Sequence, residues 1–128
     1  MFERTSYPAG VPCWVETMQT DPEAAAAFYS ELFGWKCENR MPDDAGGQYW
    51  IATLHDLEVA AIGGPIAPDT PVAWNTYTAV TSADETAKKV QAAGGTVLVE
   101  PVDAMDAGRY ATFADPEGAT FSLSQKLG

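Results

Sequence analysis

The sequence predicts an α+β fold in which two βαβββ modules form a curved mixed sheet around a cavity. Two helix-like segments each follow one strand-like segment and precede three more. Capping residues and glycines mark the ends of both helices. A hairpin signal closes the chain at Arg109–Gln125, where the turn sequence DPEG at 115–118 separates two runs of β-forming residues. Because one such unit cannot cover its own sheet face, the modules, at about 12–65 and 72–125, are expected to pack together.

The first module opens with a strand at Cys13–Gln19. Thr20 or Asp21 then caps a helix over the sequence DPEAAAAFYSELF, and Gly34 ends it. The 3.6-residue spacing predicts that one apolar stripe of this helix is buried, formed by Ala24, Ala27, Phe28 and Leu32. Three strands are expected next, at Trp35–Asn39, Gln48–Leu54 and Glu58–Ile62, with a short turn at 55–57.

The second module repeats this order after a proline-rich linker at 63–71. A strand at Val72–Val80 leads to Thr81 or Ser82, which caps a helix that Gly94 closes. A strand at Thr96–Glu100 and a loop at Val102–Gly108 precede the final hairpin. Two residue pairs lie 60 positions apart and indicate a weak internal repeat, namely Trp14 with Trp74 and Gly34 with Gly94.

Charge excludes several classes of partner. The 128 residues include 18 acidic and 7 basic side chains, for a formal net charge of −11. Such a surface repels phosphate backbones and anionic lipid, so neither nucleic-acid binding nor membrane binding is expected. The sequence has no signal-peptide character and no long apolar run, which makes the cytoplasm the expected location. Cys13 and Cys37 are expected to be reduced.

The chain resembles the vicinal oxygen chelate superfamily, which contains glyoxalase I, bleomycin resistance proteins and extradiol dioxygenases. Three segments carry the likeness: TDPEAAAAFYSELFGW, AAGGTVL and GRYATFADPEGATFSL. It is most similar to glyoxalase-like proteins of the hydroxylase type, whose first strand begins Cys-Trp-x-Glu. Many of those carry two such domains in tandem. Residues 1–128 are therefore expected to be one glyoxalase-like domain, either complete or the first half of a tandem protein.

The resemblance also implies where a metal would bind. Superfamily members usually hold it with side chains from four strands, and these positions map to Trp14, Asn75, Ser122 and the neighbourhood of Ala61. None of the four is His, Glu or Cys. Because a divalent site needs three or four suitable donors, we expect neither a metal nor another cofactor.

Several polar and aromatic side chains remain candidates for binding or catalysis. Glu16 shares a strand face with Trp14 and could act as a base or anchor a polar ligand. Tyr77 shares a face with Asn75. Arg109 could hold a ligand carboxylate, or instead pair with Asp103 or Asp106. The ligand-binding residues expected are Trp14, Glu16, Trp50, Asn75, Tyr77, Arg109 and Ser122.

Two hypotheses for function follow. The first is a metal-free cavity that binds a small aromatic or apolar molecule, as in drug or metabolite sequestration. The alternative is a superfamily enzyme (a lyase, isomerase, oxygenase or hydroxylase) that uses a metal, or uses Glu16 and Tyr77 as acid and base. The sequence does not decide between these two mechanisms, so no catalytic residue is assigned. Because single-domain members often pair to complete their cavities, a homodimer is expected.

Overall fold

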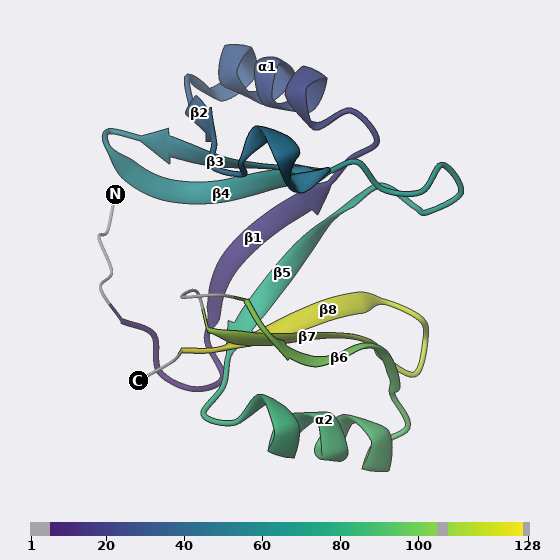
Figure 1. The fold of residues 1–128 in the computed structure, drawn as a ribbon. Coiled ribbons are helices and arrows are strands. Elements are labelled where there is room, and N and C mark those ends of the chain that lie inside the picture. Colours follow the sequence, from purple (N-terminus) through teal and green to yellow (C-terminus); the bar gives the residue numbers. More distant parts are fainter. Residues whose placement is uncertain (1–5, 105–107, 127–128) are drawn as a thin grey trace. The chain divides into compact units, whose positions relative to one another are not determined.

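The computed structural model describes residues 6–104 and 108–126. It confirms the fold class, because eight strands make up a mixed sheet in the order β2-β3-β4-β1-β5-β8-β7-β6, with two helices (Figure 1). The first module consists of β1 (Pro12–Met18), α1 (Pro22–Phe33), β2 (Lys36–Asn39), the 3₁₀ turn η1 (Asp43–Ala45), β3 (Gln48–Leu54) and β4 (Leu57–Gly64). The second consists of β5 (Ala73–Ala79), α2 (Ala83–Ala92), β6 (Thr96–Asp103), β7 (Arg109–Ala114) and β8 (Thr120–Gln125). Within the described ranges, no helix is long and apolar enough to cross a membrane.

The chain separates into two compact units. The central unit is Val15–Trp74, and the terminal unit combines Met1–Trp14 with Asn75–Gly128. In the central unit β1 pairs with β4 in parallel, while β2, β3 and β4 pair antiparallel. The terminal unit has the same arrangement, with β5 parallel to β8 and β6, β7 and β8 antiparallel. Each unit is therefore one copy of the same strand plan.

Strand pairing corrects the spacing of the internal repeat. Glu16 lies opposite Ala61 in the central unit, and Tyr77 lies opposite Ser122 in the terminal unit. Adding 61 to each number of the first pair gives the second pair, so equivalent positions are 61 residues apart and not 60. Trp14 is thus equivalent to Asn75, and the spacing between Trp14 and Trp74 is a coincidence.

Both helix starts form as the sequence predicts. The Asp21 side chain accepts from the Ala24 amide at 3.1 Å, and the Ser82 hydroxyl accepts from the Glu85 amide at 3.2 Å. Each contact satisfies an amide that has no partner inside its helix. Gly34 ends α1 in the left-handed conformation (φ 72°).

The predicted buried stripe of α1 is wrong. Phe28 and Leu32 are 60% and 57% exposed, and Ala24 and Ala27 are exposed as well. Pro22 and Ala26 are buried instead, on the side of α1 that lies against β3 and β4. The sheet there is lined by small, fully buried residues such as Ala52 and Ala60, which let the helix approach through its small face. Since both sides of α1 are apolar, periodicity alone could not choose between them.

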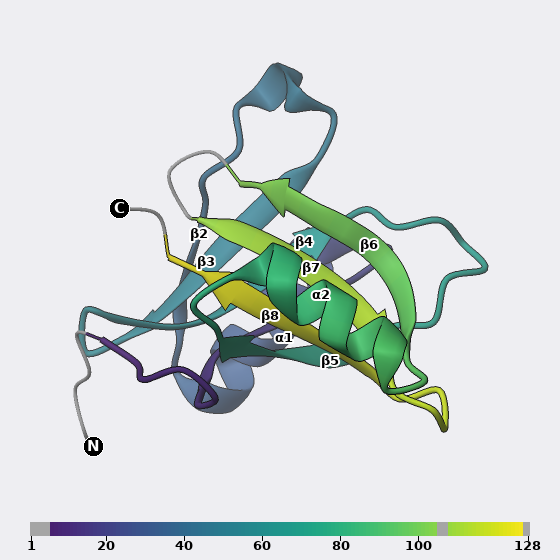
Figure 2. The same ribbon diagram turned by 90° about the horizontal axis from the view of Figure 1, so that it is seen from below.

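The core of the terminal unit lies between α2 and its sheet. Figure 2 shows α2 lying over β7 and β8. The buried cluster there consists of Ala83, Ala87, Ala111, Phe113 and Leu123. By strand alternation, Tyr110 and Thr112 of β7 and Ser122 of β8 occupy the opposite face of this sheet.

The closing hairpin confirms its turn. The Asp115 carboxylate accepts from the amides of Glu117 (2.9 Å) and Ala119 (3.0 Å), and Gly118 has φ 92°. In the hairpin of the first module, the turn predicted at 55–57 is one residue shorter. Only His55 and Asp56 separate β3 from β4, and both have positive φ. β6 continues to Asp103, so the loop predicted from Val102 begins later; residues 105–107 lie outside the described ranges.

Candidate functional site

A cluster of neutral polar side chains occupies the sheet face of the terminal unit that is turned away from α2. The Asn75 Nδ2 group donates to Ser122 Oγ at 2.6 Å, and the Thr112 and Ser122 hydroxyls are 2.7 Å apart. Strand register brings them together, because Ser122 lies opposite both Thr112 on β7 and Tyr77 on β5. Ser122 is fully buried. The three side chains thus form an uncharged hydrogen-bond network.

One atom of this cluster is left over. Asn75 Oδ1 is buried and has no hydrogen-bond partner among the residues that the structure describes. A buried acceptor without a partner costs about 1–3 kcal/mol. The oxygen therefore keeps an acceptor position that no described residue fills.

Two tyrosines border this cluster. The ring centroids of Tyr77 and Tyr110 are 6.5 Å apart, with an angle of 62° between the ring planes, and Tyr77 is only 8% exposed. Tyr77 adjoins Ser122 in the register. Trp14 belongs to the same unit and is partly exposed on β1. Aromatic rings next to a polar cluster are typical of sites that hold flat organic molecules.

The equivalent face of the central unit has different chemistry. Glu16 is 9% exposed, and its Oε2 accepts from the Tyr49 hydroxyl at 2.7 Å. The 61-residue offset relates Glu16 to Tyr77 and Tyr49 to Tyr110. It also relates apolar Ile51 and Ala61 to Thr112 and Ser122. The central unit therefore carries one oriented carboxylate where the terminal unit carries hydroxyl groups.

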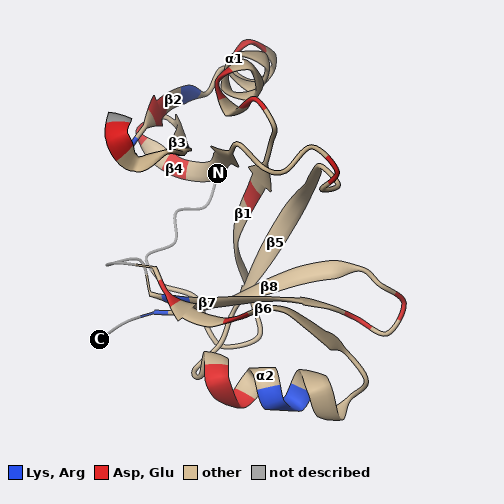
Figure 3. Ribbon diagram, turned by 45° about the vertical axis from the view of Figure 1, so that its right-hand side comes forward, with Lys and Arg blue, Asp and Glu red and all other residues tan. Residues whose placement is uncertain are grey.

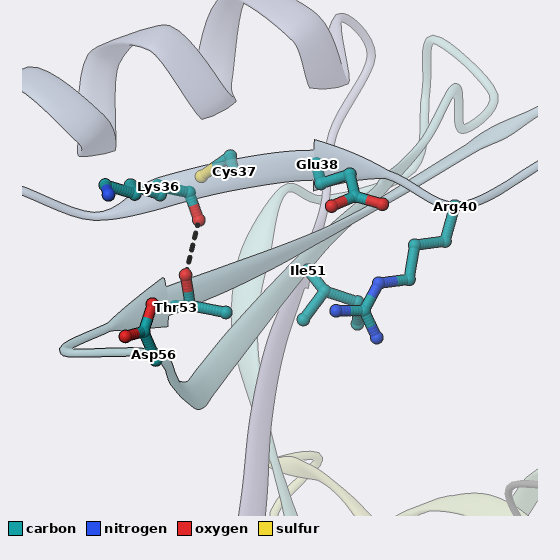
Figure 4. Close-up of a pocket in the computed structure, with 7 residues that line it drawn as sticks. All are labelled: Lys36, Cys37, Glu38, Arg40, Ile51, Thr53 and Asp56. Atoms are coloured by element: carbon teal, nitrogen blue, oxygen red, sulfur yellow. Dashed lines mark hydrogen bonds between the residues drawn. The ribbon is translucent and has the colours of Figure 1, made fainter.

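An open groove of about 520 Å³ lies on the same face of the central unit, over β2 and β3 (Figure 4). The strand register places Ile51 of β3 between Glu38 of β2 and Ala61 of β4, and Ala61 lies opposite Glu16 of β1. One row of side chains therefore crosses the sheet from the groove to Glu16. Arg40, which lines the groove, pairs with Glu58 at 2.8 Å. The lining residues are Lys36, Cys37, Glu38, Arg40, Ile51, Thr53 and Asp56.

Arg109 is engaged by acidic residues. It forms two hydrogen bonds to the Asp84 carboxylate, at 3.0 and 3.1 Å, and one to Asp103 at 3.1 Å. The pairing with Asp103 was the alternative expected for this residue, whereas Asp106 lies outside the described ranges. The hydrogen bond from Arg109 is the main cause that lowers the pKa of Asp84. Arg109 also lies on the β7 face of Ala111 and Phe113, away from Thr112.

The structure does not bring Trp50 together with Glu16. Trp50 lies opposite Ile62, on the other face of β3 from Tyr49 and Ile51. Its indole Nε1 donates to Gln48 Oε1 at 2.9 Å. Of the seven expected ligand-binding residues, strand pairing joins Asn75, Tyr77 and Ser122.

Sequence reasoning missed Thr112, Tyr110 and Tyr49. The alternation of β7 predicted that Tyr110 and Thr112 share a face, but their link to Ser122 depends on the register of the closing hairpin. Five residues, 115–119, separate the paired residues Ala114 and Thr120, so a count from the predicted four-residue turn would have shifted this register by one residue. Tyr49 had no comparable signal, because β3 meets Glu16 only through β4.

The residues present do not fit a divalent metal. Asn75 and Ser122 are weak, uncharged donors that bond to each other, and Ala61 has no donor group. In the described part of the chain, no three His, Cys, Asp or Glu side chains lie close enough to hold an ion.

The fold and these residues define a domain of the Glyoxalase/Bleomycin resistance protein/Dioxygenase superfamily, to which the chain belongs, since the family model matches residues 14–123. The chain is 42% identical over 128 residues to "Putative glyoxylase CFP32" of Mycobacterium tuberculosis. It is 34% identical over 136 residues to "Anthracycline biosynthesis protein DauV" of a Streptomyces strain, C5. These alignments cover 98% and 95% of the chain, which spans about half of each relative's length (49%).

Solved structures share the fold. Methylmalonyl-CoA epimerase from Mycobacterium tuberculosis superposes with a TM-score of 0.65 at 13% identity, covering 97% of this chain and 94% of that one. A protein from Bacillus halodurans gives a TM-score of 0.62 at 13% identity, with 89% and 92% covered. At this identity the likeness concerns the fold.

Proposed function

We propose that the chain binds a small, flat aromatic molecule that carries a hydroxyl group, and that it does so without a metal. The observation that carries this proposal is the buried Asn75 Oδ1 acceptor, whose side chain is held by a network with Ser122 and Thr112. Of these three residues, Asn75 and Ser122 are at positions that the resemblance assigns to a metal. A ligand hydroxyl would supply the missing hydrogen bond. The rings of Tyr77 and Tyr110 would contact its apolar surface.

The relatives give this ligand class independent support. One relative is named for anthracycline biosynthesis, and anthracyclines are flat, hydroxylated aromatic ring systems. A phenolic O–H is a good donor to an amide oxygen. The net charge of −11 favours neutral or cationic ligands over polyanionic ones.

A second candidate function rests on Glu16. Its nearly buried carboxylate is oriented by the Tyr49 hydroxyl, as a proton-transfer group would be. In that case Glu16 removes a proton from a bound substrate, in lyase or isomerase chemistry. Replacing Glu16 by Gln keeps the shape of the side chain but removes its basicity, so it separates the two functions.

Calorimetric titration with a panel of hydroxylated anthraquinones tests the main proposal. Binding is expected in protein treated with a chelator, and Asn75→Leu should weaken it at least about tenfold, as expected when a buried hydrogen bond of about 1.5 kcal/mol is lost. Thr76→Ala, an exposed neighbour on the opposite face of β5, is the matched control and should bind like the wild type.

Three results would contradict this. Stoichiometric metal that survives dialysis and is needed for binding would show that the chain depends on a metal, as many superfamily members do. If Asn75→Leu and the wild type bind the anthraquinones with equal affinity, Asn75 does not contribute to ligand binding. Turnover that Glu16→Gln abolishes while binding persists would favour the acid-base enzyme.

A further inference from the structure

The hydrogen-bond network around Ser122 has a direction. The amide nitrogen of Asn75 can only donate, so Ser122 Oγ accepts in their 2.6 Å contact. Among the described residues, the Ser122 hydroxyl has one further contact, with Thr112 Oγ1 at 2.7 Å. Ser122 is fully buried, and a buried O–H group without an acceptor is costly. The Ser122 hydroxyl therefore donates to Thr112.

This direction gives the two ends of the network opposite polarity. At one end, Asn75 Oδ1 is an acceptor with no hydrogen-bond partner in the described part of the chain. At the other end, Thr112 Oγ1 accepts from Ser122, so the hydrogen of the Thr112 hydroxyl is available to donate elsewhere. Thr112 is also partly exposed, whereas Ser122 is not. The same face of the sheet thus offers one acceptor and one donor.

The fold itself does not require these polar side chains. At the 61-residue offset, the three equivalent positions of the first module are apolar, namely Trp14, Ile51 and Ala61. The same strand plan therefore forms with an apolar residue at each of these positions. A partly satisfied polar network is less favourable than an apolar core. The network of the second module thus has a role other than packing.

We propose that this network selects ligands that carry a carbonyl group as well as a hydroxyl group, namely hydroxylated aryl ketones and quinones. Asn75 Oδ1 accepts from the ligand hydroxyl, and the Thr112 hydroxyl donates to the ligand carbonyl. Two hydrogen bonds and one amide group separate these two protein atoms, which corresponds to roughly 5–7 Å. A fused ring system holds both ligand groups rigidly at such a spacing. This recognition rests on the proposed function, because it concerns the same site.

The polarity of the network also excludes ligands. A methoxy group in place of the hydroxyl has no hydrogen for Asn75 Oδ1, so two acceptors would face each other. A ring system without a carbonyl leaves the Thr112 donor unmatched. Strands β5 and β8, which carry Asn75 and Ser122, contain no charged residue (Figure 3). A neutral ketone or quinone oxygen therefore suits this site better than a carboxylate, which the net charge of −11 also disfavours.

Calorimetric titration of the full chain with three compounds tests this selection, at a pH where the phenol is neutral. The compounds are 2-hydroxyanthraquinone, which carries both groups, 2-methoxyanthraquinone, which lacks the donor, and 2-hydroxyanthracene, which lacks the carbonyls. The wild type should bind 2-hydroxyanthraquinone at least about fivefold more tightly than either of the others, because each of them loses one hydrogen bond.

Two variants assign each preference to one residue. Thr112→Val removes the hydroxyl and keeps the branched shape, which Ile51 has at the equivalent position. It should abolish the preference for the quinone over 2-hydroxyanthracene and keep the preference for hydroxyl over methoxy. Asn75→Leu should do the reverse. Thr112→Ser keeps the hydroxyl and is the matched control, so it should retain both preferences. Each preference compares two ligands on one folded variant, and a change in stability does not affect it.

The outcomes distinguish this selection from the proposed function. If the wild type binds none of the three compounds, both fail. If Asn75→Leu weakens binding of 2-hydroxyanthraquinone but Thr112→Val leaves the preference for the quinone unchanged, the proposed function stands and the role of Thr112 is wrong. Equal affinity of the wild type for the hydroxy and methoxy compounds would mean that the network runs in the opposite direction, which also overturns the selection. If Thr112→Val does not fold, Thr112→Ala provides the same comparison.

Discussion

Because the Asn75 Oδ1 atom has no partner among the residues that the structure describes, we expect Asn75→Leu to raise the free energy of unfolding, although removal of a hydrogen bond usually lowers it. Asn75→Leu deletes the 2.6 Å bond from Nδ2 to Ser122, worth about 0.5–1.5 kcal/mol net. It also removes a buried acceptor whose desolvation costs about 1–3 kcal/mol. Ser122 keeps Thr112 as its partner. The balance favours the variant by about 1 kcal/mol, which corresponds to a rise in Tm of about 4 °C.

Urea unfolding followed by circular dichroism measures this balance, with Ser122→Ala as the contrasting variant. Ser122→Ala takes the partner from both Asn75 Nδ2 and the Thr112 hydroxyl, so it should destabilise the protein by about 2–3 kcal/mol. A loss of more than about 1 kcal/mol in Asn75→Leu, at an unchanged slope against urea, would mean that the amide oxygen has a partner in the free protein. The reasoning that Asn75 is kept for a ligand would then fail.

Three further outcomes are expected. The hydrogen bond from Arg109 lowers the pKa of Asp84, so this pair stabilises the fold above the ordinary Asp pKa. The contribution is lost as the pH falls through the lowered pKa. Asp84→Asn should therefore remove this part of the pH dependence of the urea midpoint. Gly108→Ala should cost more than about 2 kcal/mol in chemical unfolding, because Gly108 has φ 112° and a Cβ there would collide with a backbone oxygen of β8. Tyr49→Phe should cost about 1.5–3 kcal/mol by removing a donor to the Glu16 carboxylate, and a neutral effect would count against that bond.

Much of the fold could be read from local patterns. The caps at Asp21 and Ser82, the DPEG turn and the order of the elements depend on residues within a few positions of one another, where the chemistry of each side chain decides the backbone. The same patterns carried the likeness to the superfamily that the family model supports. The absence of metal-type donors at the mapped positions was also visible in the sequence.

Long-range contacts decided the rest. Periodicity predicted that Phe28 is buried, but the small residues of the sheet select Ala26, because a helix with two apolar sides has no preferred face until it meets its partner. Arg109 meets Asp84 across 25 positions, and Asn75 meets Ser122 across 47. The sequence alone identified the cation of Arg109 and the amide of Asn75 as candidate polar groups. The packing of α2 against β7 determined the contact of Arg109 with Asp84, and the register of β5 with β8 determined that of Asn75 with Ser122.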